Sequence, residues 1–416
     1  MFLIAPIGTS AKLRRTPIIT YLFIGINVLV YFLELVVYFT GYNNALQRLF
    51  YTLGFVPANP KWYALLTSIF VHDAPLPFHI LGNMVYLWVF GRHIENVLGS
   101  AVYALFYTTS QLGAILMQVI ALKLLDPKAL LIPQVGASGA IAALLGLFAV
   151  RFYHERIELF YAYSVLLYFR YGTVQLPSLA VLSVWFALEI LSGVLSHFSV
   201  GDTTVGHWAH VGGFLVGVVA AFSFGSLKEA QAESLTIHAE WLLRCGMFSA
   251  AVKYLKRAVR IDPANAFSRF LLSASLARVG DVNLAVAHLQ AALRYGTRSS
   301  SSGSHALTEL VSALPEEVWG ELIQLSTPQM RLDMAVLFER ACNYEIALRV
   351  FRSIVLDEHA EEELRALATI RSADILLKHY SDREGAAKML KWLCERFPNS
   401  QWADLARHML QRLGKA

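Results

Sequence analysis

A serine and a histidine stand among small residues in this chain, in a pattern that suits hydrolytic chemistry. Ser138 lies within GASGA (136–140), and His210 lies within AHVGGFLVG (209–217). A serine hydroxyl is a weak nucleophile until a positioned base takes its proton. An imidazole can take that proton and later return it to a leaving amine. The pair therefore predicts a serine nucleophile with a histidine base.

Two further polar side chains fall in apolar surroundings, His79 and Asn83 of HILGN. Strongly polar residues within membrane segments are functional candidates by default, because their burial is costly. Four residues apart on a helix, they point the same way. Together with the backbone N–H of Ser138 they are expected to donate hydrogen bonds to a developing oxyanion.

Six apolar segments have the length of membrane helices, which need roughly 20 residues each. They cover about 17–39, 79–98, 101–122, 137–153, 178–198 and 205–225. With six spans, the second, fourth and sixth run in the same direction, so their N-terminal ends lie at one membrane level. Small residues also recur at helical spacing beside both catalytic candidates, which lets membrane helices approach closely. They are Ala142, Gly146 and Ala149 beside Ser138, and Gly206, Gly213 and Gly217 beside His210.

The sequence offers His210 no evident acidic partner. Only Glu34 and Glu189 are acidic residues within the core of a span, on spans one and five. We therefore expect a Ser–His dyad in which packing orients the imidazole.

Composition divides the chain into a membrane part and a soluble part. The 416 residues are 56% hydrophobic, with a mean hydropathy of +0.49, and residues 1–226 hold only 19 of the 65 charged side chains. The expected domains are an N-terminal cytoplasmic segment (1–16), a membrane domain (17–226) and a soluble helical domain (227–416). An excess of Lys and Arg on one side places both termini in the cytoplasm. That side holds Lys12, Arg14, Arg15, Arg92, Arg151, Arg156, Arg170 and Lys228, against Arg48, Lys61, Lys123 and Lys128 opposite.

The C-terminal part shows a 34-residue spacing, as between Gly246 and Gly280, Ala251 and Ala285, or Leu255 and Leu289. This spacing resembles the tetratricopeptide repeat, a helix-turn-helix unit that builds docking surfaces. A cytoplasmic protein partner is expected there, with a flexible break at about 297–305. The three cysteines (Cys245, Cys342, Cys394) form no CxxC pair and indicate neither a disulfide framework nor a zinc site. No basic run with interleaved aromatics indicates nucleic acid.

Four motifs together resemble the rhomboid family of intramembrane serine proteases across roughly residues 17–226. They are HILGN (79–83), IENVLGS (94–100), GASGA (136–140) and AHVGGFLVG (209–217). The resemblance implies an all-α, six-helix membrane bundle with Ser138 as nucleophile, His210 as base, and His79 and Asn83 as oxyanion donors. Gly136, Gly139 and Gly213 would support this site. Ala142 departs from the family, because some members have an aromatic residue there that stacks on the catalytic histidine.

The same resemblance implies transmembrane protein substrates within the lipid bilayer, and neither a metal nor an organic cofactor. We expect an integral multi-pass protein of the bacterial inner membrane. The alternative is a catalytically silent rhomboid-like protein that binds membrane clients. Other intramembrane protease classes lack their residues here: no HExxH occurs, and the aspartates before residue 227 (Asp73, Asp126, Asp202) lie in loops.

Overall fold

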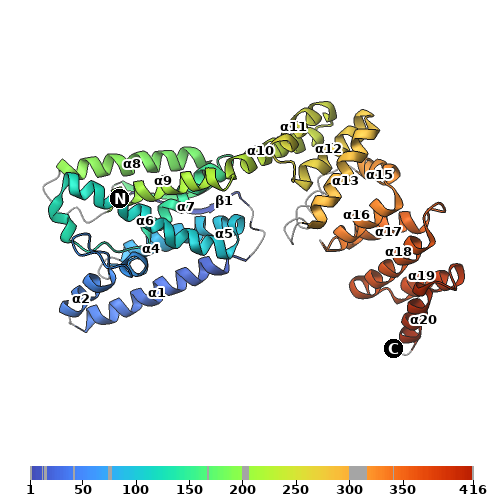
Figure 1. Cartoon of the computed structure of the whole chain (residues 1–416), viewed down its shortest axis with the longest axis horizontal. Coiled ribbons are helices and arrows are strands. Elements are labelled where there is room, and N and C mark those ends of the chain that lie inside the picture. Colours follow the sequence, from blue (N-terminus) through green and yellow to red (C-terminus); the bar gives the residue numbers. More distant parts are fainter. Residues whose placement is uncertain are drawn as a thin grey trace. The chain divides into compact units, whose positions relative to one another are not determined.

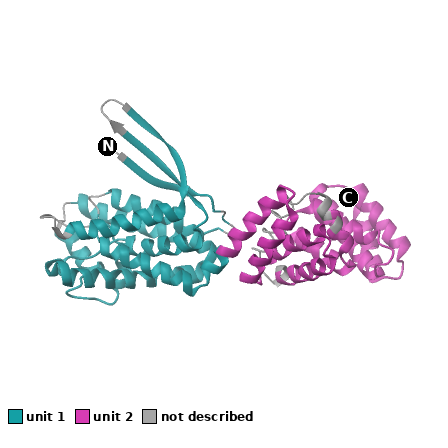
Figure 2. Cartoon of the chain, turned by 90° about the horizontal axis from the view of Figure 1, so that it is seen from above, with its two compact units in different colours: residues 1–230 teal, residues 231–416 magenta. Residues whose placement is uncertain are grey.

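The structure is a computed structural model that separates into two compact units, Met1–Ala230 and Gln231–Ala416 (Figure 2). It describes residues 2–11, 13, 16–40, 43–73, 77–165, 168–198, 206–298, 316–340 and 342–414. Helices dominate both units, so the expected all-α class is confirmed. The division between the units falls within helix α10 (Ser226–Arg244).

The first unit is a helical bundle in which helices occupy all six segments expected to be spans (Figure 1). They are α1 (Ile18–Phe39), α4 (Pro77–Tyr86) continued by the π-helical turn η1 (Leu87–Gly91) and α5 (Arg92–Leu98), α6 (Ser100–Leu125), α7 (Ser138–Arg151), α8 (Ser178–Phe198) and α9 (His207–Ser223). The connections contain α2 (Asn43–Leu53), α3 (Ala64–Thr67) and the 3₁₀ turn η2 (Pro127–Leu131). Among the described residues, three helices (α1, α6, α8) are long and apolar enough to cross a membrane, and α9 with the bent continuation α10 would make a fourth.

Helix α7 forms the centre of this bundle. Every residue from Gly139 to Ala149 is buried, whereas most of the surfaces of α1 and α8 are open to the surroundings. With 14 residues and 1.5 Å per residue, α7 is about 21 Å long, shorter than the ~30 Å core of a bilayer. Helix α7 is therefore a short helix that the rest of the bundle encloses.

Glu95 ties two helix N-termini together at one end of the bundle. Its carboxylate accepts hydrogen bonds from the backbone N–H groups of Ile19 (3.0 Å) and Thr20 (2.8 Å) and from the hydroxyl of Ser100 (2.6 Å). Negative charge at a helix N-terminus satisfies unpaired N–H groups and favours the helix dipole. The glutamate of IENVLGS therefore joins the beginnings of α1 and α6.

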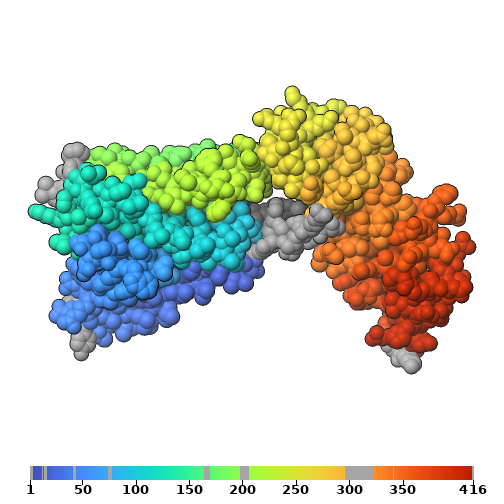
Figure 3. Space-filling view, viewed as in Figure 1, coloured from blue at the N-terminus to red at the C-terminus, as the bar shows by residue number. Residues whose placement is uncertain are grey.

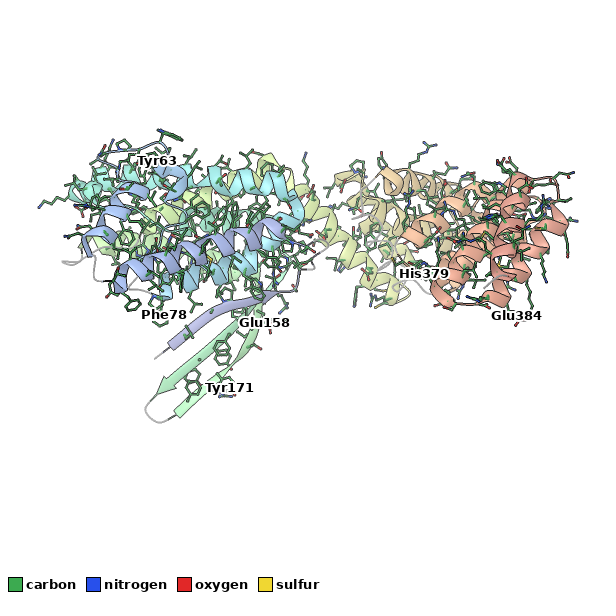
Figure 4. The ribbon with its side chains drawn as sticks, turned by 90° about the horizontal axis from the view of Figure 1, so that it is seen from below. Tyr63, Phe78, Glu158, Tyr171, His379 and Glu384 are labelled. Carbon is green, nitrogen blue, oxygen red and sulfur yellow. The ribbon has the colours of Figure 1, made fainter. Side chains whose placement is uncertain are left out.

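A three-stranded antiparallel sheet was not predicted. It pairs β1 (Phe2–Thr9) with β2 (Arg156–Val165) and β2 with β3 (Tyr168–Pro177). The sheet projects from the bundle (Figure 2), and Figure 4 labels Glu158 and Tyr171 on it. Tyr, Phe, Val and Ile are frequent in these segments and favour strands. The 1–16 segment, expected only as an N-terminal extension, thus supplies an edge strand.

The described part of the second unit is helical, and most of its helices pack on the next helix along the chain (Figure 3). After α10 follow α11 (Phe248–Ile261), α12 (Ala266–Val279), α13 (Val282–Arg298), α15 (Glu316–Leu325), α16 (Pro328–Arg340), α17 (Tyr344–Val355), α18 (Glu362–Ile375) with the π-helical turn η3 (Leu376–Tyr380), α19 (Arg383–Arg396) and α20 (Gln401–Gly414). The predicted break at 297–305 lies outside the described residues beyond Arg298.

Residues 34 apart take equivalent places in this unit. Gly246 and Gly280 both have positive φ, +74° and +92°, a conformation that favours glycine after a helix. Leu255 and Leu289 are both fully buried in one apolar core. Both glycines therefore stand in turns after helices, while assignment of the unit to the tetratricopeptide class stays a prediction.

Truncating Leu289 to alanine should destabilise the second unit by about 2–5 kcal/mol, because the buried side chain leaves a cavity. Leu289 has no exposed surface, whereas Leu356 is 67% exposed. The urea midpoint for proteolysis of residues 231–416 in the full chain measures the effect. Leu356→Ala is the control and should move the midpoint little; equal shifts in both variants would contradict the packing.

Candidate active site

Helices α7 and α9 touch through their backbones at glycines. A Cβ atom on Gly217 would lie 1.9 Å from the backbone oxygen of Ala143, and one on Gly213 would lie 2.1 Å from that of Gly139. The predicted small-residue faces therefore meet. Both pairs step by four residues in the same direction, so the two helices run parallel.

The loop before α7 is held by backbone hydrogen bonds to the loop between α1 and α4. Phe55 and Gln134 exchange both N–H···O bonds, at 2.9 and 2.8 Å, and the N–H of Gly136 donates to the carbonyl oxygen of Ser68 (2.9 Å). Gly136 has a φ of +113°, which lets the chain turn sharply into the helix. These bonds position Ser138, the half-buried first residue of α7.

His79 and Asn83 both approach this turn from α4. A Cβ atom on Gly136 would lie 2.9 Å from His79 Nε2 and 3.8 Å from Asn83 Nδ2. The two donors are thus beside the backbone two residues before Ser138. Gly136 must be a glycine for a second reason, since a side chain would enter the space that these donors occupy.

His72 holds Asn83 in place. The Asn83 amide donates a hydrogen bond from Nδ2 to His72 Nε2 (3.0 Å). Burial, and to a smaller extent the nearby His79, lowers the pKa of the His72 imidazole to about 4. The ring is therefore neutral near pH 7, with Nε2 as acceptor and the proton on Nδ1, which faces the Phe70 carbonyl oxygen at 3.4 Å. The second proton on Asn83 Nδ2 stays available for another acceptor.

His210 has an acidic partner, which corrects the expectation that packing alone orients it. His210 Nδ1 lies 2.9 Å from Glu189 Oε2, and His207 Nδ1 lies 2.8 Å from the same oxygen. The sequence places Glu189 in span five, but helical spacing does not reveal which face of α8 meets α9. The rule that intramembrane carboxylates are functional candidates would have found it.

The carboxylate determines which nitrogen of His210 can act as a base. An Nδ1–H that donates to Glu189 leaves Nε2 with its lone pair free. The Trp185 ring packs on the imidazole, with centroids 6.1 Å apart. Trp185 thus supplies the aromatic contact that Ala142 cannot. Within the described residues, His210 and Ser138 share no hydrogen bond.

Residues 59–227 of this chain match the family described as the Rhomboid domain. Rhomboid-like protein 11, chloroplastic, of Arabidopsis thaliana is 26% identical over 179 residues, which are 41% of this chain and 55% of that protein. Rhomboid protease GluP of Bacillus subtilis (strain 168) is 32% identical over 140 residues, 31% of this chain and 24% of that protein.

The matched residues cover α3 to α9 and include Ser138, His210, His79 and Asn83. This match and the apolar helices together support an integral multi-pass membrane protein. The chain spans about half the length of the first relative and about a quarter of the second. The orientation of the termini and the kind of membrane stay predictions.

Proposed function

We propose that this protein is an intramembrane serine endopeptidase that cleaves peptide bonds in or beside transmembrane helices. The observation that carries the proposal is the bond from His210 Nδ1 to Glu189. It prepares Nε2 as a base on α9, the helix in backbone contact with the helix of Ser138.

In the proposed reaction, Nε2 of His210 takes the proton of Ser138 as Oγ attacks the substrate carbonyl carbon. Glu189 stabilises the resulting imidazolium. His79, Asn83 and the N–H of Ser138, which opens α7 and has no intrahelical acceptor, donate to the oxyanion. His210 then protonates the leaving amine, and a water molecule hydrolyses the acyl-enzyme by the same base catalysis.

The proposed substrates are transmembrane proteins that enter the site from the lipid bilayer. We place the protein in a bacterial inner membrane with both termini in the cytoplasm, on the distribution of Lys and Arg. Residues 227–416 would then present tetratricopeptide-like helices to a cytoplasmic protein partner. Unchanged client selection after deletion of that part would remove this proposal.

A second candidate is the catalytically silent rhomboid-like protein that binds membrane clients. It is favoured by the missing hydrogen bond between Ser138 and His210 among the described residues. Catalytic hydrogen bonds are often long before substrate binds, so this observation alone does not decide between the two.

One assay separates the candidates: the purified protein in liposomes is incubated with a transmembrane substrate and compared with Ser138→Ala and His210→Ala. Each substitution should lower cleavage by about 10³-fold or more, because nucleophile and base act as a unit. Ser110→Ala on α6, where the hydroxyl bonds to the Tyr107 carbonyl oxygen (3.0 Å), is the control. No cleavage by the wild type and no labelling with a serine-directed probe would favour client binding.

Asn83→Ala should lower kcat by about 10²–10³-fold with little change in KM, because an oxyanion donor acts mainly in the transition state. Steady-state cleavage of a transmembrane peptide measures both constants. Asn59→Ala, at an exposed asparagine of the first loop, is the matched control. A rise in KM at constant kcat would instead assign Asn83 to substrate binding.

A further inference from the structure

Glu189, His207 and His210 form the one group of potential metal ligands of this kind within the described residues. Their ligand atoms all lie within 4.8 Å of one another. His207 and His210 are three residues apart on α9 and so share a face of the helix. Both direct Nδ1 to the same oxygen of Glu189, at 2.8 and 2.9 Å.

His207 is not needed for the catalytic arrangement. One carboxylate oxygen suffices to hold the Nδ1–H of His210, as in a serine hydrolase triad. A second imidazole on that oxygen competes for the same lone pairs. Two histidine nitrogens and a carboxylate are, however, the ligands that zinc takes in sites with three protein ligands and a water.

We propose that Glu189, His207 and His210 bind a Zn²⁺ ion that inhibits the protease; the inhibition, unlike the binding, rests on the proposed function. The three side chains are partly open, with 16%, 22% and 15% of their surfaces exposed, which leaves a fourth position for water. To form zinc–ligand bonds of about 2.0–2.2 Å, these ligand atoms would have to move only slightly apart.

Zinc and the carboxylate have opposite effects on His210. The hydrogen bond to Glu189 keeps the proton on Nδ1 and leaves Nε2 free. A metal bound at Nδ1 instead uses the Nδ1 lone pair, so the neutral ring must carry its proton on Nε2. Nε2 can no longer accept the proton of Ser138, so bound zinc switches off the base without contact with the nucleophile.

Binding is tested without activity, on the full-length Ser138→Ala protein in detergent. Equilibrium dialysis with Zn²⁺ should find one tight site, and Co²⁺ should give the visible absorption of a tetrahedral complex. Adding His207→Ala to this protein should weaken Zn²⁺ binding by about 100-fold or more. Loss of a group that only hydrogen-bonds to a metal ligand already costs 10–100-fold in metal affinity. Adding His207→Cys should restore it, because a thiolate also binds zinc. Melting curves verify that both variants fold.

His359→Ala, at a histidine in the second unit, is the control and should bind Zn²⁺ like its parent. Absence of a tight site, or equal affinity after His207→Ala, would overturn the metal site. Wild-type cleavage should slow when Zn²⁺ is added and recover with a chelator. In His207→Ala, the cleavage rate with zinc divided by the rate without zinc should approach one. Zinc that binds but does not inhibit would overturn the regulatory part. A wild type that binds zinc but never cleaves would instead refute the proposed protease function.

Discussion

Glu189→Gln should lower kcat by about 10²–10⁴-fold with KM nearly unchanged. Glutamine has the shape of glutamate but no charge to stabilise an imidazolium. Its amide can also present an N–H to Nδ1 of His210, which moves the ring proton to Nε2. A comparable loss of the carboxylate in a serine protease triad costs about 10⁴-fold. Single-substrate kinetics on a transmembrane peptide measure the effect.

The conservative variant Glu189→Asp tests the assignment of Glu189 as a positioning residue. It keeps the charge and should recover part of the activity that Glu189→Gln loses. Glu158→Gln on β2 (labelled in Figure 4) makes the same chemical change on the sheet and is the control. If Glu189→Gln cleaves at the wild-type rate, Glu189 does not assist His210, and the expected Ser–His dyad oriented by packing alone would be supported instead.

Gly217→Ala should destabilise the membrane unit by more than about 3 kcal/mol and remove most activity. The new Cβ atom would lie 1.9 Å from the Ala143 carbonyl oxygen and 2.8 Å from the Leu147 nitrogen. Both are backbone atoms of α7, so the helices must separate rather than a side chain rotate. Overpacking of ordinary cores costs about 1–3 kcal/mol, and a backbone clash exceeds that range.

Gly25→Ala provides the matched control for Gly217→Ala. Gly25 lies in α1, and no atom would lie within 4 Å of an added Cβ. Alanine is a better helix former than glycine by about 1 kcal/mol, so this variant should melt at the same temperature or higher. Thermal unfolding in detergent, with cleavage rates alongside, measures both. Equal losses in the two variants would show that α7 and α9 do not depend on this contact.

The helices and the catalytic candidates could be predicted because their signals are local. Apolar runs mark α1, α6 and α8 directly, and small residues at helical spacing predicted the α7–α9 contact. The motif residues His79 and Asn83 lie together beside Gly136, as their spacing on one helix indicated. Each of these inferences needs only residues within one segment, or the order of the segments.

The sheet and the surroundings of His210 could not be predicted, because they depend on distant pairings. Strand β1 pairs with β2, as Phe2 with Tyr163, and no local pattern in either segment specifies the other. Glu189 reaches His210 only because of the rotation of α8 about its axis. Trp185, on the same helix, packs on the ring for the same reason.

The sequence by itself indicated the membrane class and the positions of the helices, and it singled out Ser138 and His210 as candidates, since hydropathy and spacing are properties of single segments. Only the tertiary structure decided that Glu189 fixes the tautomer of His210, that His207 shares its carboxylate and that His72 holds Asn83. The physical reason is that a hydrogen bond depends on side-chain orientation to within about an ångström, and this is fixed by the packing of whole helices against one another.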